Sequence, residues 1–85
     1  MSLVLSKLLR IPQANTLACK SKSGFYEAIA KGLLPPAVKV GIRAAAWPEH
    51  ELQAINRARI AGRSDDDIRA LVQKLVADRA SLGAV

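Results

Sequence analysis

Basic and hydrogen-bonding side chains gather in two short segments of this 85-residue chain, 20–31 and 39–43. Lysine and arginine pair with phosphate oxygens, and short polar side chains hydrogen-bond to phosphates, sugars or base edges. These residue types therefore predict contacts to nucleic acid. The candidate DNA-binding residues are Lys20, Ser21, Lys22, Ser23, Tyr26, Glu27, Lys31, Lys39 and Arg43.

His50 lies between Glu49 and Glu51, a combination that suggests acid–base chemistry. Neighbouring residues of a helix point in different directions, so these three side chains do not converge. The sequence contains neither a glycine-rich phosphate loop nor a Ser/His/Asp set. One cysteine and one histidine cannot form a Cys/His zinc site within one chain. We therefore expect a binding protein and not an enzyme, with no catalytic residue, metal or cofactor.

The composition indicates one small domain with a polyanionic partner. Hydrophobic residues make up 51% of the chain, and its formal net charge is +6. Such a charge suits double-stranded DNA or an anionic membrane. Because no apolar run is long enough to span a bilayer, we expect no membrane segment. A single cysteine, Cys19, fits a reducing cytoplasm and is interpreted as a small buried apolar residue. Residues 1–7 are interpreted as a weakly packed lead-in.

Two helices joined by a short turn are expected to carry the first basic segment. Pro12 suits the first turn of a helix over 12–18. Ser21 is a good N-cap for a second helix, whose recognition segment is 21–31 and whose end is marked by Gly32. Phe25 and Ile29 share the inner face of that helix. The three residues between the helices match the turn of a helix-turn-helix unit.

A hairpin is expected to carry the second basic segment. Val38, Lys39 and Val40 alternate apolar and polar, which indicates a half-buried strand. A turn at Gly41 and Arg43 would return the chain as a second strand, giving a wing over 38–46. Trp47 is interpreted as a core residue at the base of this hairpin.

Two further helices are expected after the hairpin. Pro48, Glu49 and Glu51 mark the start of a helix that runs to about residue 61. Ser64 and three following aspartates begin another, which ends near Gly83. The predicted fold is mainly α: a winged helix-turn-helix with a short two-stranded hairpin and a C-terminal helix.

The ordered set of residues resembles the AlpA family of phage-type regulators over about residues 8–63. It comprises Arg10-Ile11-Pro12, Ser21-Lys22-Ser23, Phe25-Tyr26, Lys31-Gly32, Leu34-Pro35, Val38-Lys39-Val40-Gly41 with Arg43, Trp47-Pro48-Glu49, Glu51-Leu52 and Arg59-Ile60-Ala61. The resemblance implies a winged helix-turn-helix related to excisionases and MerR-type regulators. The family usually has Gly-Leu at Cys19-Lys20, Thr at Gly24 and an apolar residue at Asn56.

The resemblance also implies a role in transcriptional control of prophage or mobile-element genes, with helix 21–31 in the major groove and wing 38–46 on the backbone or minor groove. Three alternatives stay open: an excisionase that directs recombination, a DNA-recognition subunit for phage packaging, and a protein adaptor whose basic charge is incidental.

The C-terminal helix lies outside the resemblance, so we treat 8–63 as the DNA-binding domain and 64–85 as a separate element. Its apolar stripe has two interpretations: a fourth core helix, or a contact between two copies of the chain. Arg79 interrupts the stripe. We favour a homodimer through helix 64–82. The stripe consists of Ile68, Leu71, Val72, Leu75 and Leu82.

Overall fold

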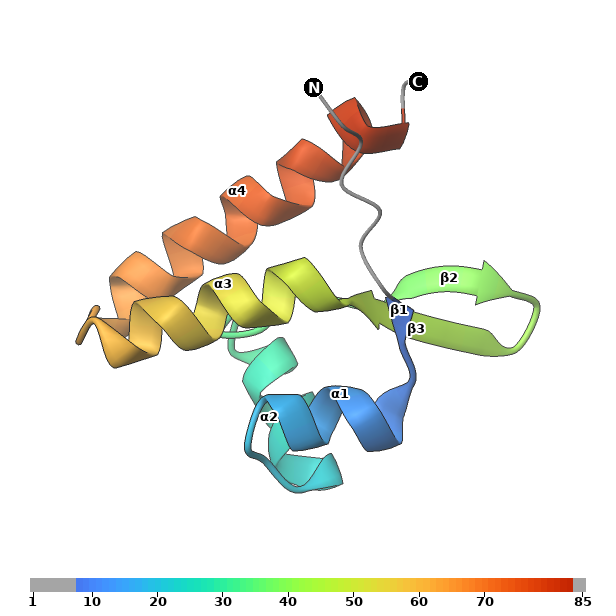
Figure 1. Cartoon of the computed structure of the whole chain (residues 1–85), viewed down its shortest axis with the longest axis horizontal. Helices are drawn as coiled ribbons and strands as arrows, with labels where there is room; N and C mark the ends of the chain where they lie inside the picture. The colour runs from blue at the N-terminus through green and yellow to red at the C-terminus, as the bar shows by residue number, and fades with distance from the viewer. Residues whose placement is uncertain (1–7, 84–85) are drawn as a thin grey trace.

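The computed structural model describes residues 8–83, with side chains described through residue 80. The lead-in predicted for 1–7 and the side chain of Leu82 lie outside the described residues. The mainly α, winged helix-turn-helix fold is confirmed (Figure 1). The elements are β1 (Leu8–Leu9), α1 (Ile11–Leu17), α2 (Lys22–Ala30), β2 (Val38–Gly41), β3 (Ala44–Pro48), α3 (Glu49–Ile60) and α4 (Asp65–Gly83).

The turn between α1 and α2 is closed by local hydrogen bonds. The hydroxyl of Ser21 accepts from the amide of Gly24 at 3.1 Å, as an N-cap does. Cys19 has φ 58°, the left-handed conformation that ends a helix. The prediction that Cys19 is buried is wrong: its side chain is exposed, because the turn places this residue on the outside.

The hairpin belongs to a three-stranded antiparallel sheet of order β1-β3-β2. The additional strand β1 pairs Leu8 with Pro48 and Leu9 with Trp47. A strand of two residues is too short to show an alternating pattern, so the sequence predicted only the β2–β3 hairpin. Pairing to β1 fixes the base of this hairpin to the residues that enter α1.

The far end of the hairpin extends beyond the helices (Figure 1). Val38 is half-buried, but Val40 is 45% exposed and Ile42, in the turn, is 94% exposed. The prediction of a half-buried face along Val38 and Val40 is therefore wrong at Val40. The helices cover only the base of the hairpin, so alternation there does not correspond to burial.

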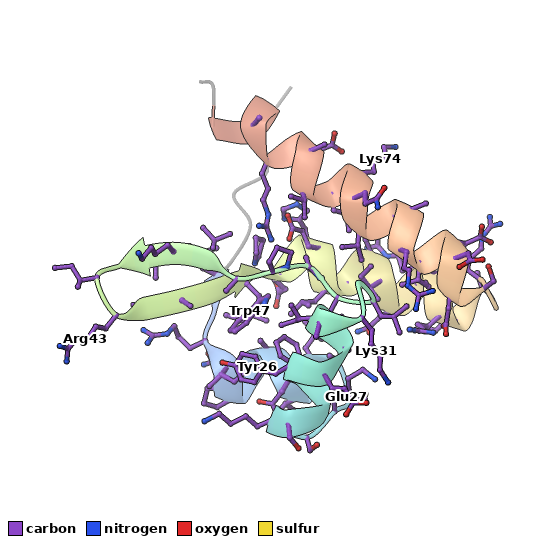
Figure 2. The ribbon with its side chains drawn as sticks, turned by 180° about the vertical axis from the view of Figure 1, so that it is seen from behind. Tyr26, Glu27, Lys31, Arg43, Trp47 and Lys74 are labelled. Carbon is purple, nitrogen blue, oxygen red and sulfur yellow. The ribbon has the colours of Figure 1, made fainter. Side chains whose placement is uncertain are left out.

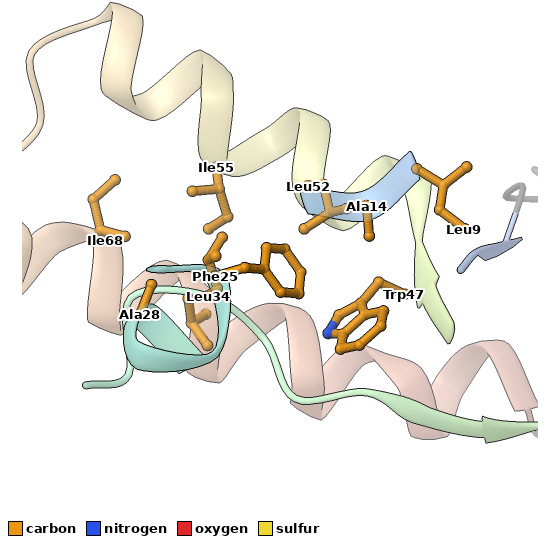
Figure 3. Close-up of a cluster of buried hydrophobic side chains, with 10 residues drawn as sticks. Leu9, Ala14, Phe25, Ala28, Leu34, Trp47, Leu52, Ile55 and Ile68 are labelled. Atoms are coloured by element: carbon orange, nitrogen blue, oxygen red, sulfur yellow. The ribbon is translucent and has the colours of Figure 1, made fainter. Parts of the chain in front are cut away.

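One hydrophobic core joins the sheet and all four helices (Figure 3). Trp47 is 1% exposed, which confirms its predicted place in the core, and its indole nitrogen donates to the carbonyl of Pro35 at 3.1 Å. Its ring meets Phe25 edge to face, with centroids 4.9 Å apart. The core residues are Leu9, Ala14, Phe25, Ala28, Leu34, Trp47, Leu52, Ile55, Ile68 and Val72.

Helix α4 is part of this core. Ile68 is fully buried and Val72 is 6% exposed, while Leu71 and Leu75 are half-buried against the same cluster. Figure 1 shows α3 between α4 and the α1–α2 pair. The inner part of the predicted apolar stripe therefore packs on the chain's own helices.

Polar contacts reinforce this packing along α4. Arg79 donates to both carboxylate oxygens of Glu51, at 2.8 and 2.6 Å, and to the carbonyl of Pro36 at 2.8 Å. Arg69 donates to the carbonyl of Lys31 at 2.9 Å, at the C-terminal end of α2. Both arginines thus connect α4 to segments that are far away in sequence.

Candidate nucleic-acid interface

The outer face of α2 consists of side chains that the core leaves free. Phe25 and Ala28 are buried, and this fixes which side of the helix faces inward. Lys22 and Ser23 on the first turn are exposed. A helix placed in the major groove meets base edges with its N-terminal residues, so these two side chains are well positioned for that role.

Tyr26 lies on the same outer face, 47% exposed. Its ring contacts those of Phe25 and Trp47 edge to face, with centroid separations of 6.1 and 6.2 Å. These contacts hold the ring against the base of the hairpin. Figure 2 shows Tyr26 next to Trp47, where α2 and the sheet meet.

Glu27 and Lys31 form an i,i+4 ion pair on α2, with Nζ 2.7 Å from Oε1. The hydrogen bond from Lys31, helped by the charge of its ammonium group, lowers the pKa of the Glu27 carboxyl. The pair is exposed and neutral as a unit. Lys31, a predicted phosphate ligand, is thus already engaged within the chain.

The other predicted residues are distributed between the turn and the hairpin. Lys20 is exposed in the turn before α2, and Ser21 serves as the N-cap described above. Lys39 is exposed on β2, and Arg43 is exposed in the hairpin turn. Figure 2 shows Arg43 at the far end of the hairpin, distant from Tyr26 and Glu27. The structure therefore brings together the α2 residues and keeps the two hairpin residues apart from them.

Charge is divided unequally between the two halves of the described chain. Residues 8–48 contain six basic residues and one acidic residue, Glu27. Residues 49–83 contain six of each sign. The net positive charge of the described residues thus lies entirely in the half that contains α1, α2 and the hairpin.

Ion pairs make the difference in charge between the two halves larger at the level of unpaired side chains. Within the described side chains, the α3–α4 half holds three arginine–carboxylate pairs: Arg59 with Asp65, Arg69 with Asp66, and Arg79 with Glu51. In the other half, the Glu27–Lys31 pair leaves four of the predicted basic residues without an ion pair among the described residues. These are Lys20, Lys22, Lys39 and Arg43.

Asn56 occupies a position where the resemblance implied an apolar residue. Its side-chain amide donates to the carbonyl of Leu17 at 3.0 Å, and so satisfies a carbonyl at the C-terminal end of α1. This contact fixes α3 to the end of the first helix. No local pattern indicates this contact, because the two residues are 39 positions apart.

The chain is similar in sequence to known proteins. The family described as "Prophage CP4-57 regulatory protein (AlpA)" matches residues 7–59, more than half of the chain. The chain belongs to the AlpA family. By this description, AlpA proteins are regulatory. The match covers α1, α2, the sheet and nearly all of α3, and leaves α4 outside.

One relative of this AlpA chain is a protein of Enterobacteria phage P4 described as "Uncharacterized protein ORF88". The two are 42% identical over 57 residues, which are 67% of this chain. The alignment covers 65% of the phage protein, slightly less than two thirds of its length. No solved structure shows significant similarity to the chain. None of the described helices is both long and apolar enough to cross a membrane.

Proposed function

We propose that this chain is a DNA-binding transcriptional regulator of a prophage or related mobile element, acting in the cytoplasm. The observation that carries the proposal is the charge division: unpaired basic residues surround α2 and the hairpin, while the charges of the α3–α4 half balance. A surface of this kind attracts the phosphate backbone and orients the protein on it. Membership in a family of prophage regulators supports the same role.

In the proposed complex, α2 lies in the major groove with Lys22 and Ser23 toward the bases. Lys20 pairs with a phosphate beside the groove. The hairpin lies over the backbone or the adjacent minor groove, with Lys39 and Arg43 as its cationic contacts. Glu27 and Lys31 border the helix as a pair, and Tyr26 supports the angle between helix and hairpin.

The test is footprinting on the DNA that flanks the chain's own gene, followed by binding titrations on the protected duplex. Lys22→Glu should weaken binding by more than about tenfold, because a phosphate or base contact becomes a repulsion. The matched control is Lys74→Glu, which makes the same charge change on an exposed residue of α4. Figure 2 shows Lys74 on the opposite side of the molecule from Tyr26 and Glu27.

The control should change affinity by no more than about threefold, through net charge alone. Equal losses for both variants would contradict the proposed face. Absence of any protected site, with no affinity for duplex DNA at low salt, would contradict the proposed function itself.

A further inference from the structure

The hairpin turn exposes an apolar side chain that the fold does not use. Ile42 is 94% exposed, and Val40 on the preceding strand is 45% exposed. An exposed isoleucine contributes nothing to the core and leaves apolar surface in water. Neither turn residue has a positive φ, so the turn backbone accepts most residue types and gives no specific reason for isoleucine. Neither packing nor turn preference explains an isoleucine at this position.

Charge surrounds this apolar tip. Arg43 is the other residue of the turn, and Lys39 lies on β2. No acidic residue occurs anywhere between Glu27 and Glu49. The end of the hairpin therefore combines two exposed apolar side chains, Val40 and Ile42, with two cations. It extends beyond the helices (Figures 1 and 2).

We propose that Ile42 is a wedge that enters the minor groove and inserts between two base pairs, so that the duplex bends. The inference rests on the proposed function and adds to it a specific deformation of the DNA. Apolar side chains at the minor groove partly unstack a base step and kink the duplex toward the major groove. Arg43 would enter the narrow, electronegative groove beside the wedge, and Lys39 would hold a flanking phosphate.

The same tip fits other occupants less well. A stable protein–protein contact buries about 800 Å² on each partner, far more than two side chains of a hairpin turn offer. An anionic membrane would attract the cations, but it would leave the basic face of α2 without a partner. A duplex uses the helix and the hairpin together, with the phosphates complementary to both.

The deformation also has a preferred place. Pyrimidine–purine steps unstack at lower cost than other steps. The bend should therefore centre on such a step within the stretch that the hairpin covers, next to the major-groove segment contacted by α2.

The experiment measures bending and unstacking at saturating protein. The footprinted duplex carries a donor and an acceptor dye at its ends, and in a second version 2-aminopurine at successive steps below the hairpin. Wild-type protein should increase energy transfer and should raise 2-aminopurine fluorescence at one step. Ile42→Ala should lose most of both signals, with affinity lowered by about tenfold or less, since the cost of unstacking is also removed.

The matched control is Ile60→Ala, which truncates an isoleucine that is 87% exposed at the end of α3. It should bend and unstack the duplex like the wild type. Circular dichroism should show both variants folded, because neither side chain belongs to the core.

Three results would overturn the wedge. They are a bend that persists in Ile42→Ala, wild-type binding without bending or unstacking, and Ile42-dependent binding to phosphatidylserine vesicles without unstacking of DNA. The second leaves the proposed function intact, because the protein still binds its site. Failure of the wild type to bind any duplex would instead overturn the proposed function.

Discussion

Cys19 has a role that its chemistry does not suggest. It is the left-handed residue that closes α1, with its amide 3.0 Å from the carbonyl of Thr16 and the next amide 2.9 Å from that of Asn15. The ends of α2 and α3 have the same hydrogen-bond pattern, but there Gly32 and Gly62 adopt the positive φ. A cysteine pays a steric cost in this conformation that glycine does not. Cys19 thus adopts, at an exposed site, the backbone conformation for which the resemblance implied a glycine.

We predict that Cys19→Gly stabilises the protein by about 0.5–1 kcal/mol, because relief of the left-handed strain exceeds the extra freedom of glycine in the unfolded chain. Urea denaturation under reducing conditions measures the change. Cys19→Ala keeps a Cβ at the same φ and should leave stability nearly unchanged. Gly62→Ala, where an added Cβ meets no neighbour within 4 Å, should cost about 1 kcal/mol. A destabilised Cys19→Gly variant would show that the thiol or its Cβ contributes more than the backbone strain.

At the scale of elements, α4 packs against the part of the chain for which DNA binding is proposed. Its apolar side enters the core, and Arg69 reaches the end of α2. Arg79 joins it to α3 and to the segment that leads into the hairpin, through Glu51 and the carbonyl of Pro36. The Glu51 side chain is fully buried and that of Arg79 is 22% exposed. Buried carboxylates are costly unless they are paired, so this ion pair constrains where α4 lies.

We predict that Arg79→Met destabilises the protein by about 3 kcal/mol or more, because it leaves the buried Glu51 carboxylate without its partner. The double variant Arg79→Met with Glu51→Gln should recover much of the loss, since the uncompensated charge is gone. Lys74→Met removes a charge from an exposed position of the same helix and should change stability by about 0.5 kcal/mol at most. Denaturant titrations of the wild type, the single variants Arg79→Met and Glu51→Gln, and the double variant give the coupling energy between the two side chains. Additive losses would contradict a stabilising ion pair.

Helix α2 and the hairpin should make different contributions to recognition. Lys39→Ala and Arg43→Ala should weaken specific and non-specific duplexes alike, because phosphate contacts do not depend on sequence. Lys22→Ala or Ser23→Ala should weaken the specific site by about 1–3 kcal/mol more than a random duplex, if a base contact is lost. Competitive titrations with both duplexes measure the ratio. Equal losses on both duplexes for every variant would contradict the assignment of α2 to base reading.

At the scale of the molecule, the division of charge sets the response to salt. Four predicted phosphate ligands have no ion pair among the described residues: Lys20, Lys22, Lys39 and Arg43. If these four residues contact phosphates, they displace counterions from the DNA. The logarithm of the association constant for DNA should then fall with the logarithm of the salt concentration at a slope of about −4. Lys39→Ala should reduce the magnitude of this slope by about 1. An affinity that is flat between low and moderate salt would exclude binding through the phosphates.

Homodimerisation through helix 64–82 stays a prediction. Since Ile68 and Val72 are used by the chain's own core, a second copy would have to cover the half-buried Leu71 and Leu75. Complete burial of a leucine side chain contributes about 1.5–3 kcal/mol to the free energy of association. Twofold symmetry doubles the number of leucines that are buried. Sedimentation should find the wild type as a dimer at high concentration, and Leu71→Asp with Leu75→Asp as a folded monomer. A wild type that stays monomeric, with a double variant that unfolds, would assign the whole stripe to the core.

Local signals in the sequence were sufficient for most of the secondary structure. The cap at Ser21, the glycines at 32 and 62, and the proline at 48 mark helix ends through interactions within a few residues, so they act the same way in any fold. The spacing of Phe25 and Ala28 fixes the inner face of α2 by helix geometry alone. The sequence by itself therefore determined the helices, the hairpin, the outer face of α2 and, through the ordered set of family residues, the fold class.

The tertiary structure decided what depends on contacts between distant segments. Strand β1 exists because β3 is available to pair with it, and Val40 is exposed because no helix reaches the far end of the hairpin. Arg79 interrupts the apolar stripe in the sequence. In the fold it forms an ion pair with Glu51, 28 positions away. The sequence shows the total charge but not which charges neutralise one another. Arg69 and Asp66 are three positions apart on one helix, so their pairing is local. The pairing of Arg79 with Glu51 is different, because only the fold brings these two side chains within 2.6 Å.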